Sequence, residues 1–469
     1  MIRSISTSQP AGDRPATTPR RHFLKLAVAA AGVGLSTPPL RAAASRRRPG
    51  QKLRLGLIGT SGRGRNMIRD LLQLDEDVIA LCDVDPARLA EGAGIAAPKY
   101  AGARQYRDYR KMLEQEKELD AVIVTTPDHM HAPISLLAMS RGLHVFCEKP
   151  LARTVGEARR MRELARTTGV VTQMGTQGSA SHALRRAVEV IRAGVLGTVR
   201  EVHVWTDRTP KLQKENVGSA TVPAGMNWDD WIGVAPPRPY SRNLHPFAWR
   251  WWTGFGTGPL GDMACHLTNI AFRALDLMDP TEIDVSVGAA PAPGMFGAGS
   301  RIVYRFPERV GRKPVTLTWY DGGRLPDQAL LEAHGIPQQF GKVPGSEKLI
   351  IGDRGVLYGD AYLKLNGEPR FNGVAKHPAC LAIPESIARA RQQGTLGHYQ
   401  EWIEACKGNG QTYAGFEVAA AHTEMVTLGT VALQLGRRIR WDPVAMRVPG
   451  EPAADALLQP TYRPGFTLA

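Results

Sequence analysis

A glycine-rich turn near the start of the chain has the residues to hold a phosphate. The turn Gly59-Thr60-Ser61-Gly62-Arg63-Gly64 lies between an apolar run, 53–59, and a segment with helical spacing, 66–74. Backbone N–H groups in such a turn, together with the positive end of the next helix, can bind a pyrophosphate. Ser61 occupies the usual second glycine position, and Gly62 beside it leaves the backbone room to approach a ligand. The turn predicts a dinucleotide site, and the alternative is a glycine turn without a ligand.

A carboxylate follows this turn at a suitable distance for binding a ribose. The apolar run 78–82 ends in Asp83, roughly 20 residues beyond the turn. A carboxylate there accepts hydrogen bonds from ribose hydroxyls and repels a 2′-phosphate, which favours NAD over NADP. Arg63 could offset that repulsion, Asp85 could be the acceptor instead, and Asp83 could only cap the turn at Pro86.

Two further apolar runs also end in polar side chains. Thr125-Thr126-Pro127-Asp128-His129-Met130-His131 follows the run 121–124, and Glu148-Lys149-Pro150 follows the run 144–147. The carboxyl ends of strands in a doubly wound parallel sheet face a common ligand crevice. We therefore expect contacts to the cofactor from Thr125, Thr126, Pro127, His131, Glu148 and Lys149.

Together these motifs resemble the family of glucose-fructose oxidoreductase, inositol dehydrogenase and MocA (Gfo/Idh/MocA). Glu-Lys-Pro at this spacing is the hallmark of that family, and a preceding Thr-Pro-x-His-x-His segment is typical of it. A later family segment reads Gly-x-x-x-Asp-x-Gly-x-His-x-x-Asp. This chain keeps Gly258, Asp262 and His266 of that segment and departs from it at Ala264 and Asn269.

The resemblance implies that Lys149, Asp262 and His266 meet at a nicotinamide. Alcohol oxidation needs a base for the hydroxyl proton, and a histidine suits that role. Lys149 would polarise the reacting oxygen and Asp262 would orient its partners. Whether Lys149 or His266 takes the proton stays open. Gln177 resembles a family position near the nicotinamide.

Two other interpretations concern histidines and tryptophans near these motifs. His129, His131, Asp262 and His266 are possible metal ligands, but the family chemistry needs no metal and none is expected. We expect His129 to be a loop histidine with its hydrogen bonds satisfied. The cluster Trp249-Arg250-Trp251-Trp252 suits either stacking on a sugar or burial in the core.

The N-terminal 50 residues have the features of an export signal. Arg20-Arg21-His22-Phe23-Leu24-Lys25 precedes an apolar run, 26–35, and Ala42-Ala43-Ala44 then fits a cleavage site. This pattern is typical of a twin-arginine signal. The apolar run is too short to span a bilayer, so we expect a periplasmic or otherwise exported protein with no stable membrane span after processing.

The net charge of +15 is concentrated in the same region. Residues 1–50 hold nine Lys or Arg side chains against a single acid, Asp13. No basic stretch is interleaved with aromatic residues, which argues against nucleic-acid binding. The five cysteines form no CxxC pair and are expected to be small buried side chains.

The order of the patterns predicts two domains. Residues 1–51 form the signal and a linker, and 52–172 alternate strands and helices as a Rossmann domain with a doubly wound parallel sheet. Alternating runs at 199–205, 283–287, 301–306 and 315–320 predict an α+β domain, 173–440, with a large, mostly antiparallel open sheet. Long loops are expected at 206–260 and 321–347, and 441–469 is a C-terminal tail.

The motifs and the signal together predict an exported oxidoreductase acting on a sugar or polyol. Little free dinucleotide exists outside the cytoplasm, so tight retention of NAD, or of NADP, is expected. The alternatives are an NAD-dependent glycosidase that oxidises a hydroxyl transiently, although such relatives lack the Glu-Lys-Pro lysine, and a non-catalytic periplasmic sugar-binding protein. The family also implies a dimer or tetramer formed through the open sheet.

Overall fold

The structure is a computed structural model that describes residues 50–209, 220–289 and 292–466. The predicted export segment, 20–44, lies outside the described residues. In the described ranges, no helix is both long enough and apolar enough to cross a membrane.

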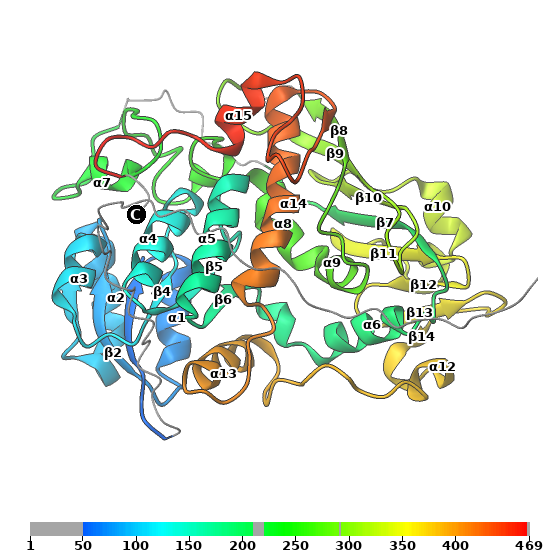
Figure 1. Cartoon of the computed structure of the whole chain (residues 1–469), viewed down its shortest axis with the longest axis horizontal. Helices are drawn as coiled ribbons and strands as arrows, with labels where there is room; N and C mark the ends of the chain where they lie inside the picture. The colour runs from blue at the N-terminus through cyan, green and yellow to red at the C-terminus, as the bar shows by residue number, and fades with distance from the viewer. Residues whose placement is uncertain (1–49, 210–219, 290–291, 467–469) are drawn as a thin grey trace, which may run out of the picture. The chain divides into compact units, whose positions relative to one another are not determined.

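The first domain contains a sheet of six parallel strands in the order β3-β2-β1-β4-β5-β6 (Figure 1). Its strands are β1 Arg54–Ile58, β2 Asp77–Cys82, β3 Arg104–Tyr106, β4 Ala121–Val124, β5 His144–Glu148 and β6 Thr172–Gly175. Its helices are α1 Arg63–Leu71, α2 Pro86–Tyr100, α3 Tyr109–Gln115, α4 Asp128–Ser140 and α5 Val155–Thr168. The chain order reverses between β1 and β4, which is where such sheets bind ligands. The predicted Rossmann domain is confirmed, and its last strand, β6, extends beyond residue 172.

The alternation of side chains along β4 explains how both faces of this sheet are covered. Ala121 and Ile123 pack with α1, α2 and α13 (Gly394–Cys406), whereas Val122 and Val124 pack with α3, α4 and α5. Successive residues of a strand point to opposite faces, so a strand buried on both sides needs a continuous apolar run. Helix α13 comes from late in the chain and completes one face of the first domain.

The second domain contains a nine-stranded sheet in the order β14-β13-β12-β11-β7-β10-β9-β8-β15. Its strands are β7 Val199–Thr206, β8 Glu282–Ala289, β9 Ala298–Phe306, β10 Val315–Tyr320, β11 Ser346–Gly352, β12 Gly355–Tyr358, β13 Tyr362–Leu365, β14 Asn372–Gly373 and β15 Ile439–Arg440. Among the described pairs, β7 and β10 run parallel and the others run antiparallel. The predicted mostly antiparallel sheet is therefore confirmed.

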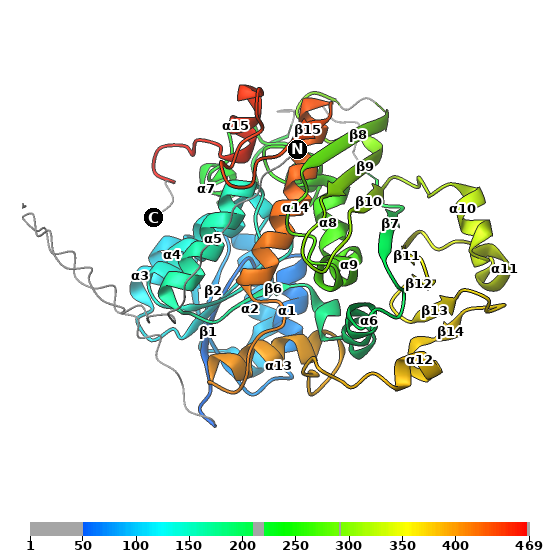
Figure 2. The same cartoon turned by 45° about the vertical axis from the view of Figure 1, so that its right-hand side comes forward.

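Helices join the two domains along one side of this sheet. The helices α6 His182–Arg192, α8 Gly258–Leu267, α9 Asn269–Ala274 and α14 Phe416–Leu435 belong to the second domain. Helix α14 packs against α5 of the first domain and against α8 of the second, and it lies between the two sheets in Figure 2. This contact fixes α8, which carries Asp262 and His266, relative to the strand ends of the first domain.

Three predicted irregular regions contain helices. The predicted loop 206–260 holds α7 (Trp228–Ile232), where Asn227 caps the helix by accepting hydrogen bonds from two backbone N–H groups. The predicted loop 321–347 holds α10 (Gln328–Ala333) and α11 (Ile336–Phe340). The predicted tail 441–469 holds α15 (Pro452–Leu458). These short helices have too few apolar residues to produce a readable period, so the prediction of loops was wrong at these positions.

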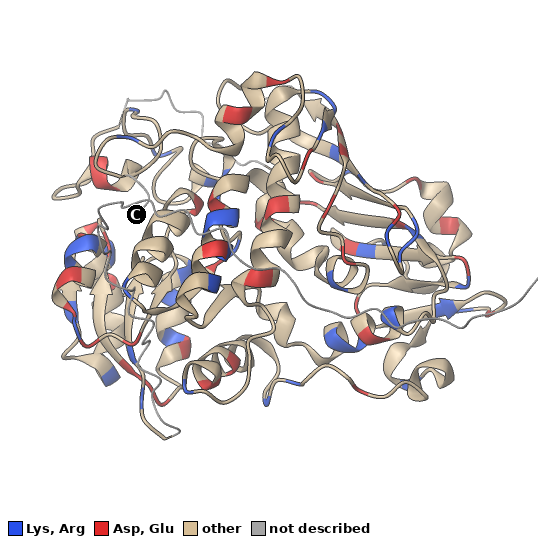
Figure 3. Cartoon of the chain, viewed as in Figure 1, with Lys and Arg blue, Asp and Glu red and all other residues tan. Residues whose placement is uncertain are grey.

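Cysteines and charges are arranged as in an ordinary globular protein. All five cysteines are buried free thiols, which confirms their expected role as small core residues. Basic and acidic residues are distributed over both domains in Figure 3.

Candidate active site

A cavity of about 490 Å³ lies beyond the carboxyl ends of β1, β2, β4 and β5. Every cofactor-binding residue predicted from the sequence lines it except Gly64. The predicted catalytic Lys149 lines it as well, whereas Asp262 and His266 are not among the lining residues. Parallel strands thus bring together side chains that are far apart in sequence, as expected for this edge of a doubly wound sheet.

The glycine turn is shaped by close contacts that exclude larger residues. A Cβ added to Gly64 would lie 1.9 Å from the Gly59 carbonyl oxygen, and Gly59 itself has a φ of +92°. A Cβ added to Gly62 would meet no atom within 4 Å, because this side of the turn faces the cavity. Gly62 also precedes the first turn of α1, which no described side chain caps, and the N-terminal turn of a helix is suited to bind an anion. The turn therefore fits a pyrophosphate.

Asp83 lines the cavity at the end of β2, and it also stabilises the glycine turn. Its Oδ2 accepts a hydrogen bond from the backbone N–H of Thr60 at 2.9 Å, and Oδ1 accepts one from the N–H of Asp85 at 3.1 Å. Burial raises the pKa of this carboxyl above its usual range. Asp85, the alternative ribose acceptor, instead caps α2 through the N–H of Ala87 at 2.9 Å and does not line the cavity.

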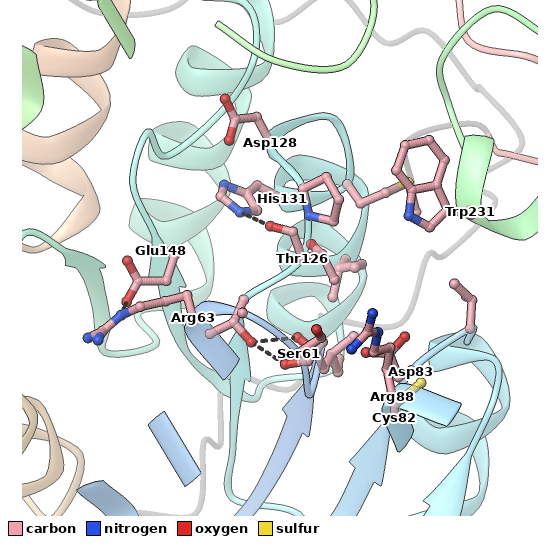
Figure 4. A pocket seen from close by; sticks show the side chains of 18 of the residues that line it. Ser61, Arg63, Cys82, Asp83, Arg88, Thr126, Asp128, His131, Glu148 and Trp231 are labelled. Carbon is pink, nitrogen blue, oxygen red and sulfur yellow. Dashed lines mark hydrogen bonds and ion pairs between the residues drawn. The ribbon is translucent and has the colours of Figure 1, made fainter. Parts of the chain in front are cut away.

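Arg63, which could offset the repulsion between Asp83 and a 2′-phosphate, lies on the other side of the cavity. Arg63 Nε donates to Glu148 Oε1 at 2.8 Å, and its guanidinium also contacts the Tyr399 hydroxyl. Figure 4 shows this pair on one side of the pocket and Asp83 with Arg88 on the opposite side. Arg88, rather than Arg63, is therefore the cation beside the predicted ribose site.

Glu148 joins Arg63 to a third predicted residue. Gln177 Nε2 donates to Glu148 Oε1 at 3.0 Å. A Cβ added to Gly175 would lie 2.5 Å from the carboxyl carbon of Glu148, so only glycine fits beneath this side chain. The cluster fixes the wall of the cavity next to Lys149.

Lys149 and Asp262 form an ion pair at the end of β5. The ammonium nitrogen of Lys149 lies 2.7 Å from Asp262 Oδ1 and 2.8 Å from the Asp262 carbonyl oxygen. Arg250 Nη1 lies 3.5 Å from the same Oδ1 and 3.4 Å from Asp128 Oδ1. Thr257 Oγ1 donates to the other oxygen of Asp128 at 2.7 Å. The result is a row of alternating charges, Asp128, Arg250, Asp262 and Lys149, across the two domains.

The electrostatics of this row keep Asp262 ionised. Burial by itself raises the pKa of this carboxyl, but the nearby Arg250 and Lys149 outweigh that effect and lower the pKa to about 2. His266 follows Asp262 by one turn of α8. Burial, followed by the charge of Lys149, lowers the pKa of His266 to about 3. The structure thus joins Lys149 to Asp262 and places a neutral imidazole within the field of the ammonium.

The strand-end residues before α4 mostly bond to the protein backbone. Thr125 Oγ1 donates to the Gly59 carbonyl oxygen at 2.5 Å. His131 lies between two carbonyl oxygens, with Nδ1 2.7 Å from that of Pro150 and Nε2 2.8 Å from that of Thr126. Both ring nitrogens can donate only when the imidazole is doubly protonated. His131 therefore ties the two strand-end turns together.

The remaining histidine and tryptophans have structural partners. His129 is buried in the first turn of α4, not in a loop as expected. Its Nε2 lies 2.9 Å from the Trp231 carbonyl oxygen, but its Nδ1 has no hydrogen-bond partner among the described residues, so the expectation that its hydrogen bonds are satisfied was only half right. Within the described ranges, no group of three or more His, Cys, Asp or Glu side chains is placed to hold a metal ion. Trp249 lines the cavity with Arg250 over its ring at 4.4 Å, whereas Trp251 and Trp252 belong to the core.

Sequence reasoning missed several residues that line the cavity. Asp128 and Arg250 lie within quoted motifs, but no charge role was predicted for them. Other missed lining residues come from segments without a motif: Tyr109, Arg110, Asp230, Trp231, His245, Phe247 and Phe466. Only the frequent Trp and Arg residues between 226 and 252 could have indicated that this segment forms a second wall of the cavity.

Two family models match the chain. One is described as an oxidoreductase family with an NAD-binding Rossmann fold and matches residues 53–176. The other is described as the C-terminal alpha/beta domain of the oxidoreductase family and matches residues 183–310. Together they cover more than half of the chain.

Similar curated proteins match over part of their length. A glycosyl hydrolase family 109 protein of Stenotrophomonas maltophilia is 30% identical over 212 residues, 44% of this chain and 45% of the relative. The inositol 2-dehydrogenase of Salmonella typhimurium is 30% identical over 155 residues, 32% of this chain and 45% of the relative. The chain spans about half the length of these relatives.

Solved structures share the fold over most of the chain. An inositol dehydrogenase homologue from Azotobacter vinelandii, complexed with NADH and myo-inositol, has a TM-score of 0.57 and 20% identity, and the match covers 84% of this chain and 99% of that one. A levoglucosan dehydrogenase complexed with NADH and levoglucosan has a TM-score of 0.57 and 16% identity, with 84% and 100% coverage. With the family models and the site geometry, these findings confirm the resemblance noted in the sequence. The chain belongs to the Gfo/Idh/MocA family of oxidoreductases.

Proposed function

We propose that the protein transfers a hydride between a sugar or sugar-like polyol and a tightly held nicotinamide dinucleotide. The observation that carries the proposal is the Lys149–Asp262 ion pair, whose ammonium stands on the wall of a cavity that begins at the glycine turn. Relatives named inositol 2-dehydrogenase and levoglucosan dehydrogenase support a sugar or polyol as the substrate.

The residues around the cavity fit a dinucleotide. Gly62 leaves the turn open to a pyrophosphate, Gly64 lets the turn pack closely on Gly59, and Asp83 offers a carboxylate to a ribose. This carboxylate favours NAD over NADP, although Arg88 beside it lessens the repulsion of a 2′-phosphate. When bound, the nicotinamide supplies the hydride acceptor for an alcohol carbon.

Lys149 is placed to hold the reacting oxygen. An ammonium has three N–H donors, and Asp262 accepts from two of them through its carboxylate and its carbonyl oxygen. The third donor is then available to an oxygen in the cavity, where the positive charge stabilises a developing alkoxide. Asp262 stays ionised at neutral pH because its pKa is about 2, so it keeps the ammonium in position.

His266 does not line the cavity, whereas Lys149 does. The imidazole of His266 is neutral at neutral pH because its pKa is about 3, and an imidazole of such low basicity takes up a proton poorly. We therefore assign the oxygen contact to Lys149, and the acceptor of the hydroxyl proton is either Lys149 or His266. Replacing either residue distinguishes the proposed enzyme from the alternative of a non-catalytic sugar-binding protein. The enzyme would lose turnover, whereas the binding protein has no turnover to lose.

Mass spectrometry of small molecules released from the denatured wild-type protein tests the cofactor. We expect one nicotinamide dinucleotide per chain, followed by turnover on members of a sugar and polyol panel. Gly64→Ala should abolish cofactor binding, because its Cβ would overlap the Gly59 carbonyl oxygen. Gly94→Ala is the matched control, since a Cβ there meets no atom within 4 Å. A wild-type protein that neither contains nor binds NAD or NADP would refute the proposal.

A second candidate reaction is favoured by the similarity to a glycosyl hydrolase family 109 protein. In such a reaction a ring hydroxyl is oxidised to a ketone by loss of a hydride, and the neighbouring C–H, now acidic, loses a proton as the glycosidic substituent leaves with a proton. Water then adds in place of the substituent, and return of the hydride restores the hydroxyl. Nitrophenyl glycosides distinguish the two reactions. Release of nitrophenol without net reduction of NAD supports the glycosidase, and accumulation of NADH on a free sugar supports the dehydrogenase.

Export through the twin-arginine machinery is part of the proposal. The motif Arg20-Arg21 and the following apolar run support it. Replacing both arginines by lysine should leave the protein in the cytoplasm of a host that exports the wild type to the periplasm. Equal amounts of both forms in the periplasm would contradict this part of the proposal.

A further inference from the structure

One end of the cavity is closed by the last described residues of the chain, 459–466. A dinucleotide across this sheet places its adenosine half on the β1-β2-β3 side, since Asp83 at the end of β2 faces a ribose. Tyr109 and Arg110, which follow β3, line the cavity on that side. Phe466 lines it too, and only 8% of this side chain is exposed.

Phe466 packs with two arginines from different parts of the chain. The guanidinium of Arg110 lies over its ring at 5.1 Å, and that of Arg463 lies over it at 4.9 Å. Arg110 belongs to α3 of the first domain, whereas Arg463 belongs to the C-terminal segment, 459–466. The contact therefore connects the C-terminal segment to the rim of the predicted adenosine site.

Both arginines are also bound to the segment around α7. Arg110 Nη2 donates to Asp230 Oδ1 at 2.7 Å, and Arg463 Nη1 donates to Asp229 Oδ1 at 2.5 Å. Arg463 Nε donates to the Gly233 carbonyl oxygen at 2.7 Å. Three segments that are more than 100 residues apart thus form a closed ring of contacts around one end of the cavity. In Figures 1 and 2 the C-terminal segment runs from α15 toward α7.

The C-terminal segment is anchored at its other end as well. The Tyr462 hydroxyl donates to Glu157 on α5, and Gln459 packs so closely on Gly156 that an added Cβ would lie 2.6 Å from it. Leu458 and Ala454 of α15 are buried. The segment is therefore a packed element of the first domain's surface, although it is the last described part of the chain.

We propose that the C-terminal segment completes an adenosine-binding subsite in which Phe466, Arg110 and Tyr109 receive the adenine. Flat aromatic bases pack favourably on aromatic rings and on guanidinium planes. Because the same residues hold the ring of contacts closed, the dinucleotide leaves only after the C-terminal segment detaches. This inference rests on the proposed function, and it explains how the chain retains its cofactor.

The test compares ligands that contain adenosine with one that does not. Phe466→Ala and Arg463→Ala are the test variants, and Thr461→Ala, an exposed residue of the same segment, is the matched control. NADH-loaded full-length protein is mixed with excess NAD, and the loss of bound NADH fluorescence gives the dissociation rate. Calorimetry measures the affinities for AMP and for nicotinamide mononucleotide.

We expect NADH to dissociate about ten-fold faster from Phe466→Ala than from the wild type, and Thr461→Ala to stay within about two-fold of it. The affinity for AMP should fall similarly, while that for nicotinamide mononucleotide is unchanged. Unchanged NADH release in both test variants would overturn the inference and leave the proposed function intact. A wild type that binds neither NADH nor NAD would overturn both. Arg463→Ala keeps the test decisive if Phe466→Ala does not fold.

Discussion

The two ends of the cavity are built on different physical principles. The end near Lys149 is a row of alternating charges that joins α4, β5 and α8 through Arg250, and these side chains are at most 16% exposed. The end near Asp83 is closed by an aromatic ring and by arginine–aspartate contacts that solvent reaches, since the side chain of Asp229 is 70% exposed. In the proposed function, the first end fixes a reacting group and the second end covers the cofactor.

Because of this difference, the two ends should respond differently to substitutions and to salt. Removing one member of a buried charge row leaves its partner without compensation, which costs several kcal/mol. Exposed ion pairs contribute roughly 0–1 kcal/mol each and weaken in salt. We therefore expect substitutions near Lys149 to act on the catalytic rate, and substitutions near Phe466 to act on the residence time of the cofactor.

The largest effect is expected for Lys149→Met. Losing the ammonium removes the hydrogen bond and the charge at the reacting oxygen, so kcat should fall roughly 10³-fold, while NADH still binds. Lys348→Met is the matched control, because Lys348 is a buried lysine paired with Asp360 at 2.6 Å but lies outside the cavity. Stopped-flow hydride transfer measures the effect. Equal losses in both variants would show that the ion pair acts only on stability.

Asp262→Asn should have the next largest effect, roughly 10²-fold on kcat, because the amide leaves Lys149 less firmly held. The same carboxylate affects acid stability. Its pKa is about 2 in the folded protein and 3.8 in a free side chain, so it stabilises the fold above pH 3.8 and loses that effect as the pH falls toward 2. Unfolding of the variant between pH 4 and 2 should therefore be less pH-dependent than that of the wild type. An identical acid profile would mean that Arg250 and Lys149 do not act on this carboxylate.

The chemistry at the Lys149 end could largely be predicted from sequence, because it depends on strand ends. The runs 121–124 and 315–320 coincide with β4 and β10. Once the strands are parallel, residues directly after them must meet, and this places Thr126, Glu148 and Lys149 at one cavity without any long-range information.

The closure of the other end could not be predicted. Strand β3, Arg104–Tyr106, has no apolar run, so the sheet edge beside the adenosine site was missed. The contacts of Phe466 join segments more than 200 residues apart, and no spacing encodes them. The place of Arg63 in the turn suggested that it could offset the repulsion of a 2′-phosphate by Asp83, but Arg63 bonds to the Glu148 carboxylate and to Tyr399 on the opposite side of the cavity.

Salt should act differently on the two ends of the cavity, and its effect should be smaller than those of the substitutions above. Raising the ionic strength from about 0.05 to 0.5 M shortens the Debye length to a few Å and weakens the exposed pairs of Arg463 and Arg110. We expect NADH release to become roughly three-fold faster, while the rate of hydride transfer at saturating cofactor is nearly constant. Release from Arg463→Ala, which already lacks one pair, should respond less. A salt-independent release in the wild type would show that Phe466 packing alone closes the site.

The last effect concerns the stability of the fold and not the reaction or the release of the cofactor, and it depends on His131, which lines the cavity. Burial alone lowers the pKa of this imidazole, but Cys147, Asp128 and the Pro150 carbonyl outweigh it and raise the pKa to about 9. A folded-state pKa above the unfolded value of 6.5 means that the stabilisation is complete below pH 6.5 and is lost as the pH rises through 9.

The wild type should therefore lose at most about 3 kcal/mol of unfolding free energy between pH 6.5 and 9 through this group. His131→Gln, which cannot donate to both carbonyl oxygens, should be less stable at pH 6.5 and should show a flatter profile up to pH 9. His182→Gln is the control, since His182 Nε2 faces only the Ala390 carbonyl oxygen, at 3.0 Å, outside the cavity. Urea unfolding at several pH values measures the slopes. Parallel profiles for His131→Gln and the wild type would mean that the imidazole is not doubly protonated, and the link between the Thr126 and Pro150 turns would then rest on a single hydrogen bond.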